Sequence, residues 1–113
     1  MRVHFRIRVT RGADIALGPG KVDLLEAIAK TGSITSAARV LGMSYRRAWL
    51  LVDTMNRSFN HPVVEAESGG SRGGGTHLSA TGIEAVRRYR KIEQLAARAA
   101  AAEMRALLKL VRR

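Results

Sequence analysis

The chain has no cysteine, few acidic residues and few aromatic side chains. Of its 113 residues, 9 are Asp or Glu, 20 are Lys or Arg, and 4% are aromatic. Without cysteine, disulfides, thiolate zinc sites, iron–sulfur clusters and cysteine nucleophiles are excluded. The scarcity of aromatic residues argues against a stacking platform for single-stranded RNA. The net charge of +11 favours a polyanionic partner, with nucleic acid the first candidate and an anionic membrane the second.

Long hydrophobic runs are also lacking. The alanine-rich stretch over residues 95–111 is interrupted by four charged side chains, which a membrane-spanning helix does not readily accept. The first 12 residues hold four arginines and no apolar core of a signal peptide. We therefore expect a cytoplasmic protein with no membrane partner. Its length fits a single domain over residues 1–113.

Residues 3–9 alternate between apolar and polar side chains, which is the period of a β-strand. One face would carry Val3, Phe5, Ile7 and Val9, and the other Arg2, His4, Arg6 and Arg8. Residues 12–20 have the glycine and proline content of a turn region. The apolar spacing that follows predicts a helix over residues 21–31, which Gly32 ends.

The next segment has the pattern of a helix-turn-helix. Thr35 is a candidate cap for a short helix over residues 36–41, which Gly42 ends in a left-handed conformation. Ser44 then caps a third helix that runs to about residue 59. In a helix-turn-helix this last helix enters the major groove of DNA and its first turns touch base edges. An ordinary helical hairpin needs the same glycine turn, so the motif alone leaves both interpretations open.

The third helix has one apolar and one charged face. Its buried stripe is predicted to be Ala48, Val52, Met55 and Phe59. On the other face, Arg46 and Arg47 could bond guanine or clamp a phosphate, and Leu50 could contact a thymine methyl group. Tyr45 and Trp49 lie at the edge of the buried stripe and are expected to pack there. The Tyr45 hydroxyl could instead reach a phosphate.

A glycine-rich segment separates two short strand-like runs. Residues 63–67 and 76–78 have strand composition, and five glycines lie in residues 68–77. This pattern predicts a hairpin, or wing, on which Arg72 reaches phosphates or the minor groove. A flexible linker is the alternative. A nucleotide-binding loop fits poorly, because Gly75 stands where that loop needs a lysine.

The last helix is predicted to begin after Ser79 and to be unusually long. Helical spacing is kept by Ile83, Val86, Tyr89, Ile92, Ala96 and Ala99. A helix that continued to Arg113 would be about 50 Å long and would overhang a core of this size. We therefore expect it to form the dimer interface, with a break near Glu103 as the alternative. Neither a metal site, nor a cofactor site, nor a catalytic relay can be assembled from the three separated histidines, so no enzyme is predicted.

The chain resembles the N-terminal DNA-binding domain of the ModE family of molybdenum-responsive regulators, itself similar to the winged domain of LysR-type regulators. The resemblance spans about residues 20–93 and rests on the run SYRRAW at residues 44–49, the wing glycines and Leu78-Ser79. It implies a homodimer that grips a pseudo-palindromic operator. Full-length members carry a C-terminal oxyanion-binding module, whereas this chain ends at Arg113. Molybdate is therefore not expected to alter DNA binding, and any effector is unknown.

These observations predict a mostly α fold with a small β-hairpin wing, a winged helix-turn-helix with a long C-terminal dimerisation helix. The predicted partners are double-stranded DNA and a second copy of the chain. The predicted DNA-binding residues are Ser44, Tyr45, Arg46, Arg47, Leu50, Arg72 and Thr76. The predicted function is a DNA-binding transcriptional regulator. The alternative is an architectural protein that binds DNA through charge with little reading of sequence.

Overall fold

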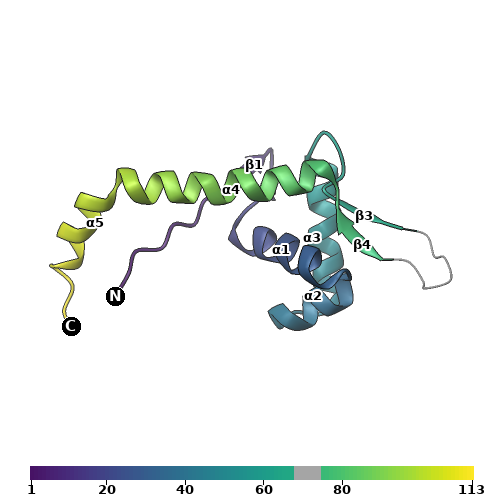
Figure 1. The fold of residues 1–113 in the computed structure, drawn as a ribbon, viewed down its shortest axis with the longest axis horizontal. Coiled ribbons are helices and arrows are strands. Elements are labelled where there is room, and N and C mark those ends of the chain that lie inside the picture. The colour runs from purple at the N-terminus through teal and green to yellow at the C-terminus, as the bar shows by residue number, and fades with distance from the viewer. Residues whose placement is uncertain (68–74) are drawn as a thin grey trace.

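A computed structural model describes residues 1–67 and 75–113. Within this part of the chain there are five helices and two small antiparallel hairpins (Figure 1). The mostly α fold class is as predicted. The elements are β1 (Val9–Arg11), β2 (Asp14–Leu17), α1 (Pro19–Thr31), α2 (Ile34–Leu41), α3 (Tyr45–Ser58), β3 (Val64–Ala66), β4 (Thr76–Leu78), α4 (Ala80–Ala99) and α5 (Ala101–Leu108).

The first three helices form the core of the fold. Glycines end α1 and α2 in the left-handed conformation, Gly32 with φ 76° and Gly42 with φ 68°, where other residues are strained. The core is built from fully buried aliphatic side chains of α1, small side chains of α2, and one face of α3. Its buried members include Val22, Leu24, Leu25, Ile28, Ala37, Ala38, Ala48, Val52 and Met55. The alanines of α2 allow close approach of the neighbouring helices.

The predicted cap of the second helix is wrong. Ser33, and not Thr35, caps α2, because the Ser33 hydroxyl accepts a hydrogen bond from the Ser36 amide at 2.9 Å. Gly32 turns the chain at once, so the next residue is already extended and can serve as the cap. The helix therefore begins at Ile34, earlier than expected.

The predicted strand over residues 3–9 is also wrong. The strand β1 covers only Val9–Arg11 and pairs with β2, Asp14–Leu17, inside the segment expected to be a turn region. The alternation nevertheless governs burial, because Ile7 packs against the core whereas Arg6 and Arg8 are exposed. The Tyr89 hydroxyl donates a hydrogen bond to the Ile7 carbonyl at 2.8 Å. An anchor to α4, and not a strand partner, thus holds this extended segment.

The C-terminal helices extend beyond the core. Ser79 caps α4 as predicted, accepting from the Gly82 amide at 3.1 Å. The helix does not continue to Arg113 but breaks at Ala100, three residues before Glu103, and α5 turns away from the axis of α4 (Figure 1). The molecule measures 58 × 30 × 23 Å with a radius of gyration of 16.7 Å. A compact domain of this length would have a radius of gyration of about 13 Å. The overhang predicted from the sequence is therefore present.

Ion pairs of Arg90 fix α4 to α1, and one aromatic side chain of α4 is buried in the core. Arg90 contacts Glu26 in a bidentate pair, Asp23 at 3.0 Å and Glu93 at 2.8 Å. The hydrogen bond with Glu26 is the largest effect that raises the pKa of Arg90. Tyr89 beside it is only 2% exposed, so it belongs to the core of the fold. One member of the apolar stripe predicted for dimerisation, Tyr89, is therefore already buried in the core and does not face a partner.

Candidate nucleic-acid interface

The N-terminal end of α3 is exposed to solvent. The Ser44 hydroxyl accepts a hydrogen bond from the Arg47 amide at 3.1 Å, which caps the helix as predicted. Tyr45, Arg46 and Arg47 follow in the first turn and are all exposed. This end of α3 lies beside α2, on the side of the core away from α4 (Figure 1). Its free amide groups and its arginines make it electropositive.

The outward face of α3 is that predicted from the sequence. Arg46 is exposed, and Leu50, one turn further, is 48% exposed. Asp53 lies on the same face, where its carboxylate would repel phosphates. Arg57 pairs with it at 3.1 Å between Nε and Oδ2. The pair leaves the first turns of α3 as the positive part of this face.

Two aromatic side chains depart from the prediction. Tyr45 is 55% exposed and Trp49 is 47% exposed, so neither packs at the edge of the core. Two amphipathic rings therefore stand beside Arg46 on the surface. Such rings place a polar N–H or O–H group within reach of a phosphate.

The wing is positioned directly by α3. As predicted, β3 and β4 pair antiparallel, with Val64 opposite Leu78. The Asn56 side chain on α3 accepts hydrogen bonds from the Val63 amide at 2.8 Å and the Val64 amide at 3.1 Å. It also donates to the Val64 carbonyl at 3.2 Å. A single side chain thus satisfies three backbone groups at the root of the wing, a role that periodicity alone does not indicate.

Two further contacts fix the base of the wing. A Cβ atom on Gly82 of α4 would lie 2.1 Å from the Val63 carbonyl oxygen, so the close approach of α4 requires glycine. The Thr76 amide donates to the Gly32 carbonyl at 2.9 Å, which joins β4 to the turn after α1. Thr76 therefore lies at the base of the wing. Arg72, the predicted contact at its tip, is outside the described residues.

The acidic residues are concentrated away from the N-terminal end of α3. Three of the nine surround Arg90 between α1 and α4, and Glu84 pairs with Arg88 at 3.1 Å. Two more lie at the base of the wing, where His77 is 3.3 Å from Glu65 and 3.8 Å from Glu67. Cations remain in excess on α3, on α4, on the N-terminal segment and on the C-terminal tail.

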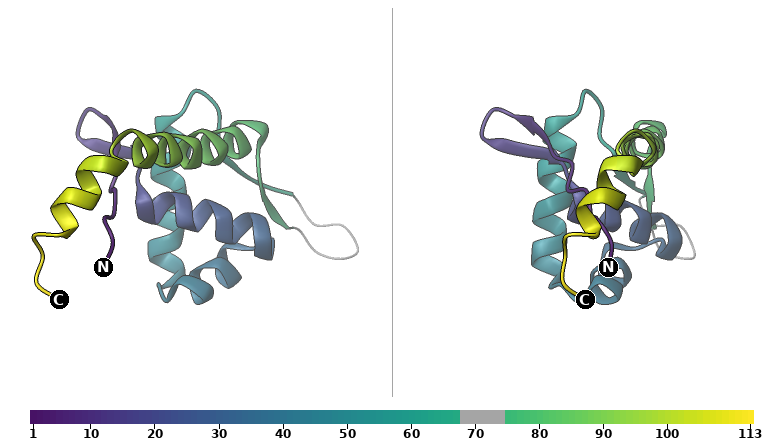
Figure 2. Two further views of the ribbon diagram at one scale, coloured as in Figure 1. Left: turned by 60° about the vertical axis from the view of Figure 1, so that its left-hand side comes forward. Right: turned by 90° about the vertical axis from the view of Figure 1, so that its left-hand side faces the viewer.

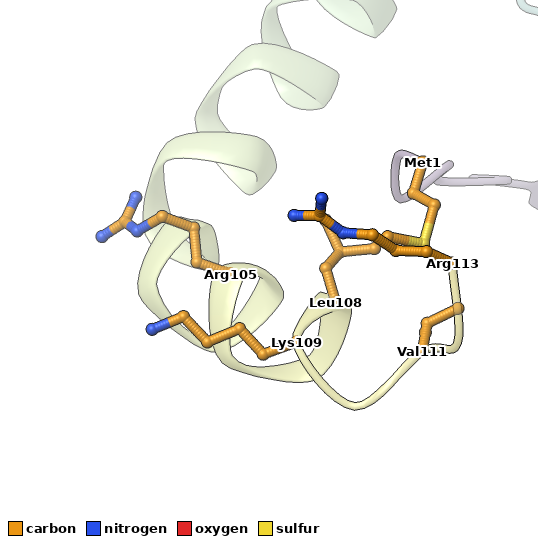
Figure 3. A pocket seen from close by; sticks show the side chains of 6 residues that line it. All are labelled: Met1, Arg105, Leu108, Lys109, Val111 and Arg113. Atoms are coloured by element: carbon orange, nitrogen blue, oxygen red, sulfur yellow. The ribbon is translucent and has the colours of Figure 1, made fainter.

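A hollow between α5 and the N-terminus has no acidic or histidine side chain in the described part of its lining. It measures about 380 Å³ and is lined by Met1, Leu108, Val111 and three basic side chains. The charged ends of Arg105 and Lys109 point away from Met1 (Figure 3). Among the described residues, no cluster of His, Asp or Glu side chains could hold a metal ion. None of the described helices is both long enough and apolar enough to cross a membrane.

The three-helix core, the capped and exposed third helix and the antiparallel hairpin after it define a winged helix-turn-helix. Residues 20–82 match the model of the bacterial regulatory helix-turn-helix proteins of the LysR family. The chain belongs to this family.

Relatives and solved structures agree with this assignment. The chain is 42% identical over 92 residues to the molybdenum transport protein ModE of Azotobacter vinelandii, covering 80% of this chain and 34% of that protein. It is 46% identical over 77 residues to the molybdenum-pterin-binding protein MopB of Rhodobacter capsulatus, covering 68% and 28%. The chain therefore spans about a third of these relatives or less. The predicted resemblance to the ModE family is confirmed.

The fold is similar to that of the CbnR DNA-binding domain, solved in a crystal structure with DNA. The TM-score is 0.58 at 22% sequence identity, and the match covers 78% of this chain and 95% of the other. The predicted winged helix-turn-helix fold is confirmed by this similarity.

Proposed function

We propose that this chain is a DNA-binding transcriptional regulator that places α3 in the major groove and its wing along the adjacent backbone. One observation supports this most strongly. The first two turns of α3 expose Arg46 and Leu50 on one face, while Ala48 and Val52 bury the other in the core. A helix that is anchored on one side and positively charged at its start has the geometry that base reading requires.

We assign some residues of α3 to contacts with bases and others to contacts with phosphates. Arg46 faces outward and is assigned a bidentate contact with guanine, and Leu50 beside it a contact with a thymine methyl group. Ser44 and Tyr45 are assigned phosphate contacts at the start of the helix. Arg47 lies about 100° from Arg46 around the helix and is assigned to the backbone at the rim of the groove.

We assign to the wing a contact with a neighbouring phosphate. Arg72 carries this role in the proposal, and the hydrogen bonds of Asn56 and Thr76 fix the hairpin from which it extends. Glycines in such a loop allow the backbone to approach DNA closely.

A homodimer would present two such units to a two-fold symmetric operator. The exposed apolar side chains beside the core support this proposal. Ile92 and Leu95 on α4 are 47% and 51% exposed, and Val9 lines a groove together with Ile92. Val9 and Ile92, together with Phe59 and Tyr89, border this mostly apolar groove of about 250 Å³, which Arg88 also lines. A helix from a second copy is a fitting cover for such a face.

The proposed function is tested by comparing cognate with scrambled DNA. Footprinting on the DNA upstream of the protein's own gene would define a candidate operator duplex. Fluorescence anisotropy at about 0.15 M salt then compares this duplex with a scrambled duplex of equal length. A regulator is expected to prefer the operator by about a thousandfold or more. Equal affinity for the two duplexes would instead indicate an architectural protein.

A further inference from the structure

The basic side chains of the N-terminal segment have no role in the interface described so far. Residues 1–8 are extended and unpaired, but Ile7 is anchored through its carbonyl to the Tyr89 hydroxyl and through its side chain to the core. In an extended chain alternate side chains point to opposite sides. Arg6 and Arg8 therefore both project away from the core, and the anchor at Ile7 holds them in place.

These two arginines line a groove beside α3. The groove measures about 230 Å³, and Lys21 of α1 and Arg47 of α3 line it with them. Ile15 and Leu51 supply its apolar lining. Four cationic side chains from three separate segments of the sequence thus meet in one hollow. The first turn of α1, with the positive end of its helix dipole, also lies here.

The groove has an unbalanced positive charge. None of the described residues that line it carries a carboxylate. Burial lowers the pKa of Lys21, while Asp14 nearby acts in the opposite direction. The Lys21 ammonium also donates to the Ile15 carbonyl, which orients it. An anion bound in the groove would offset both the repulsion among the four cations and the desolvation of Lys21.

The position of the groove indicates which anion it receives. Arg47 and Leu51 belong to α3 itself, next in sequence to the outward residues Arg46 and Leu50. The β1–β2 hairpin and the wing lie on opposite sides of α3 (Figure 2). A duplex that received α3 in its major groove would therefore bring one backbone towards the wing and the other towards this groove.

We propose that the groove lined by Arg6, Arg8, Lys21 and Arg47 binds a backbone phosphate of DNA, on the side of α3 away from the wing. This inference rests on the proposed DNA-binding function. Arginine suits the role because its guanidinium group can bond two phosphate oxygens at once. The N-terminal segment would then act as a second arm, and α3 would be gripped from both sides.

The test compares two double variants that remove the same charge. Arg6→Gln/Arg8→Gln empties the groove of two cations, and Arg112→Gln/Arg113→Gln removes two exposed cations from the tail. Affinity for the footprinted duplex is measured by anisotropy across a salt series. The groove variant is expected to bind about tenfold more weakly. Its slope of log affinity against log salt should fall by about 1 for each lost phosphate contact. The tail variant should retain the wild-type slope. Equal effects of the two variants would overturn the proposal.

A duplex series with single methylphosphonate substitutions locates the contact. Neutralising the flanking phosphate that sits in the groove should weaken the wild type but not the Arg6→Gln/Arg8→Gln variant. A wild type that loses no affinity at any flanking position would contradict the proposal while leaving the proposed function intact. If the wild type bound none of the duplexes, the proposed function itself would be rejected.

A titration with inorganic phosphate distinguishes a groove that binds a free anion from one that binds the DNA backbone. Phosphate is titrated at constant ionic strength against the wild type while the amide NMR signals of the groove are followed. Tight saturation of these signals, together with a groove variant that binds DNA like the tail variant, would mean that the groove holds a free anion. That result would overturn the backbone assignment.

Discussion

At the scale of single residues, a few side chains fix how the DNA-facing parts are oriented. Asn56, Ser79 and Gly82 all act on the short segment that leads into β3. The Ser79 hydroxyl donates to the Pro62 carbonyl, and its amide donates to the Val63 carbonyl at 3.0 Å. Gly82 lets α4 come into contact with the same segment. The direction of the wing is therefore determined by three polar or small residues that lie outside the apolar stripes.

Gly82→Ala tests this close approach. The added Cβ would overlap the Val63 carbonyl oxygen, so α4 or β3 must shift, and the variant should lose about 1 to 3 kcal/mol of unfolding free energy. Gly20→Ala on α1 is the matched control, because no atom lies within 4 Å of its new Cβ. The control should be neutral or gain up to about 1 kcal/mol. Urea denaturation measures both, and similar stabilities for the two variants would refute the role of Gly82.

At the scale of helices and strands, the sequence correctly predicted the features that depend on residues close together in the chain. The glycine ends of α1 and α2, the caps at Ser44 and Ser79 and the β3–β4 hairpin follow from local chemistry. The strand expected over residues 3–9 did not form along its length, because alternation reports which side is buried and not whether a partner strand is present. The anchor between Tyr89 and Ile7 joins residues 82 positions apart, which no local pattern reveals.

The candidate site was predictable to a similar degree. Arg46, Arg47 and Leu50 are exposed as their spacing on α3 indicates. The exposure of Tyr45 and Trp49 depends on tertiary packing, which their spacing on α3 does not determine. The basic groove escaped prediction for the same reason, since it combines side chains from three segments.

Asn56→Ala tests the link between α3 and the wing. The change leaves the amides of Val63 and Val64 without their side-chain partner and should cost about 1 to 3 kcal/mol of stability. Asn56→Asp retains the acceptor for both amides but loses the donor to the Val64 carbonyl, so it should be less destabilising. Hydrogen exchange of β3 and β4 would follow the effect locally. Unchanged exchange in the alanine variant would show that the wing is held by other contacts.

At the scale of the whole molecule, α4 and the apolar groove beside it are expected to be covered by a second copy. Leu95→Glu places a carboxylate at the exposed apolar face of α4, whereas the neighbouring Gln94→Glu places one about 100° away around the helix. Leu95 is half exposed, so the monomer should remain folded. Sedimentation velocity should find Leu95→Glu monomeric and Gln94→Glu dimeric. Two dimeric variants would locate the interface elsewhere.

The central claim is that α3 reads base sequence and that the rest of the molecule grips the backbone. Arg46→Ala and Arg47→Ala separate these two roles, because the two side chains are neighbours that face different directions. Affinities for the footprinted operator and for a scrambled duplex are measured by anisotropy at one moderate salt concentration. Arg46→Ala should cost about 1 to 3 kcal/mol on the operator and much less on the scrambled duplex. Arg47→Ala should weaken both duplexes by a similar factor. Equal losses on both duplexes for Arg46→Ala would contradict base reading by α3.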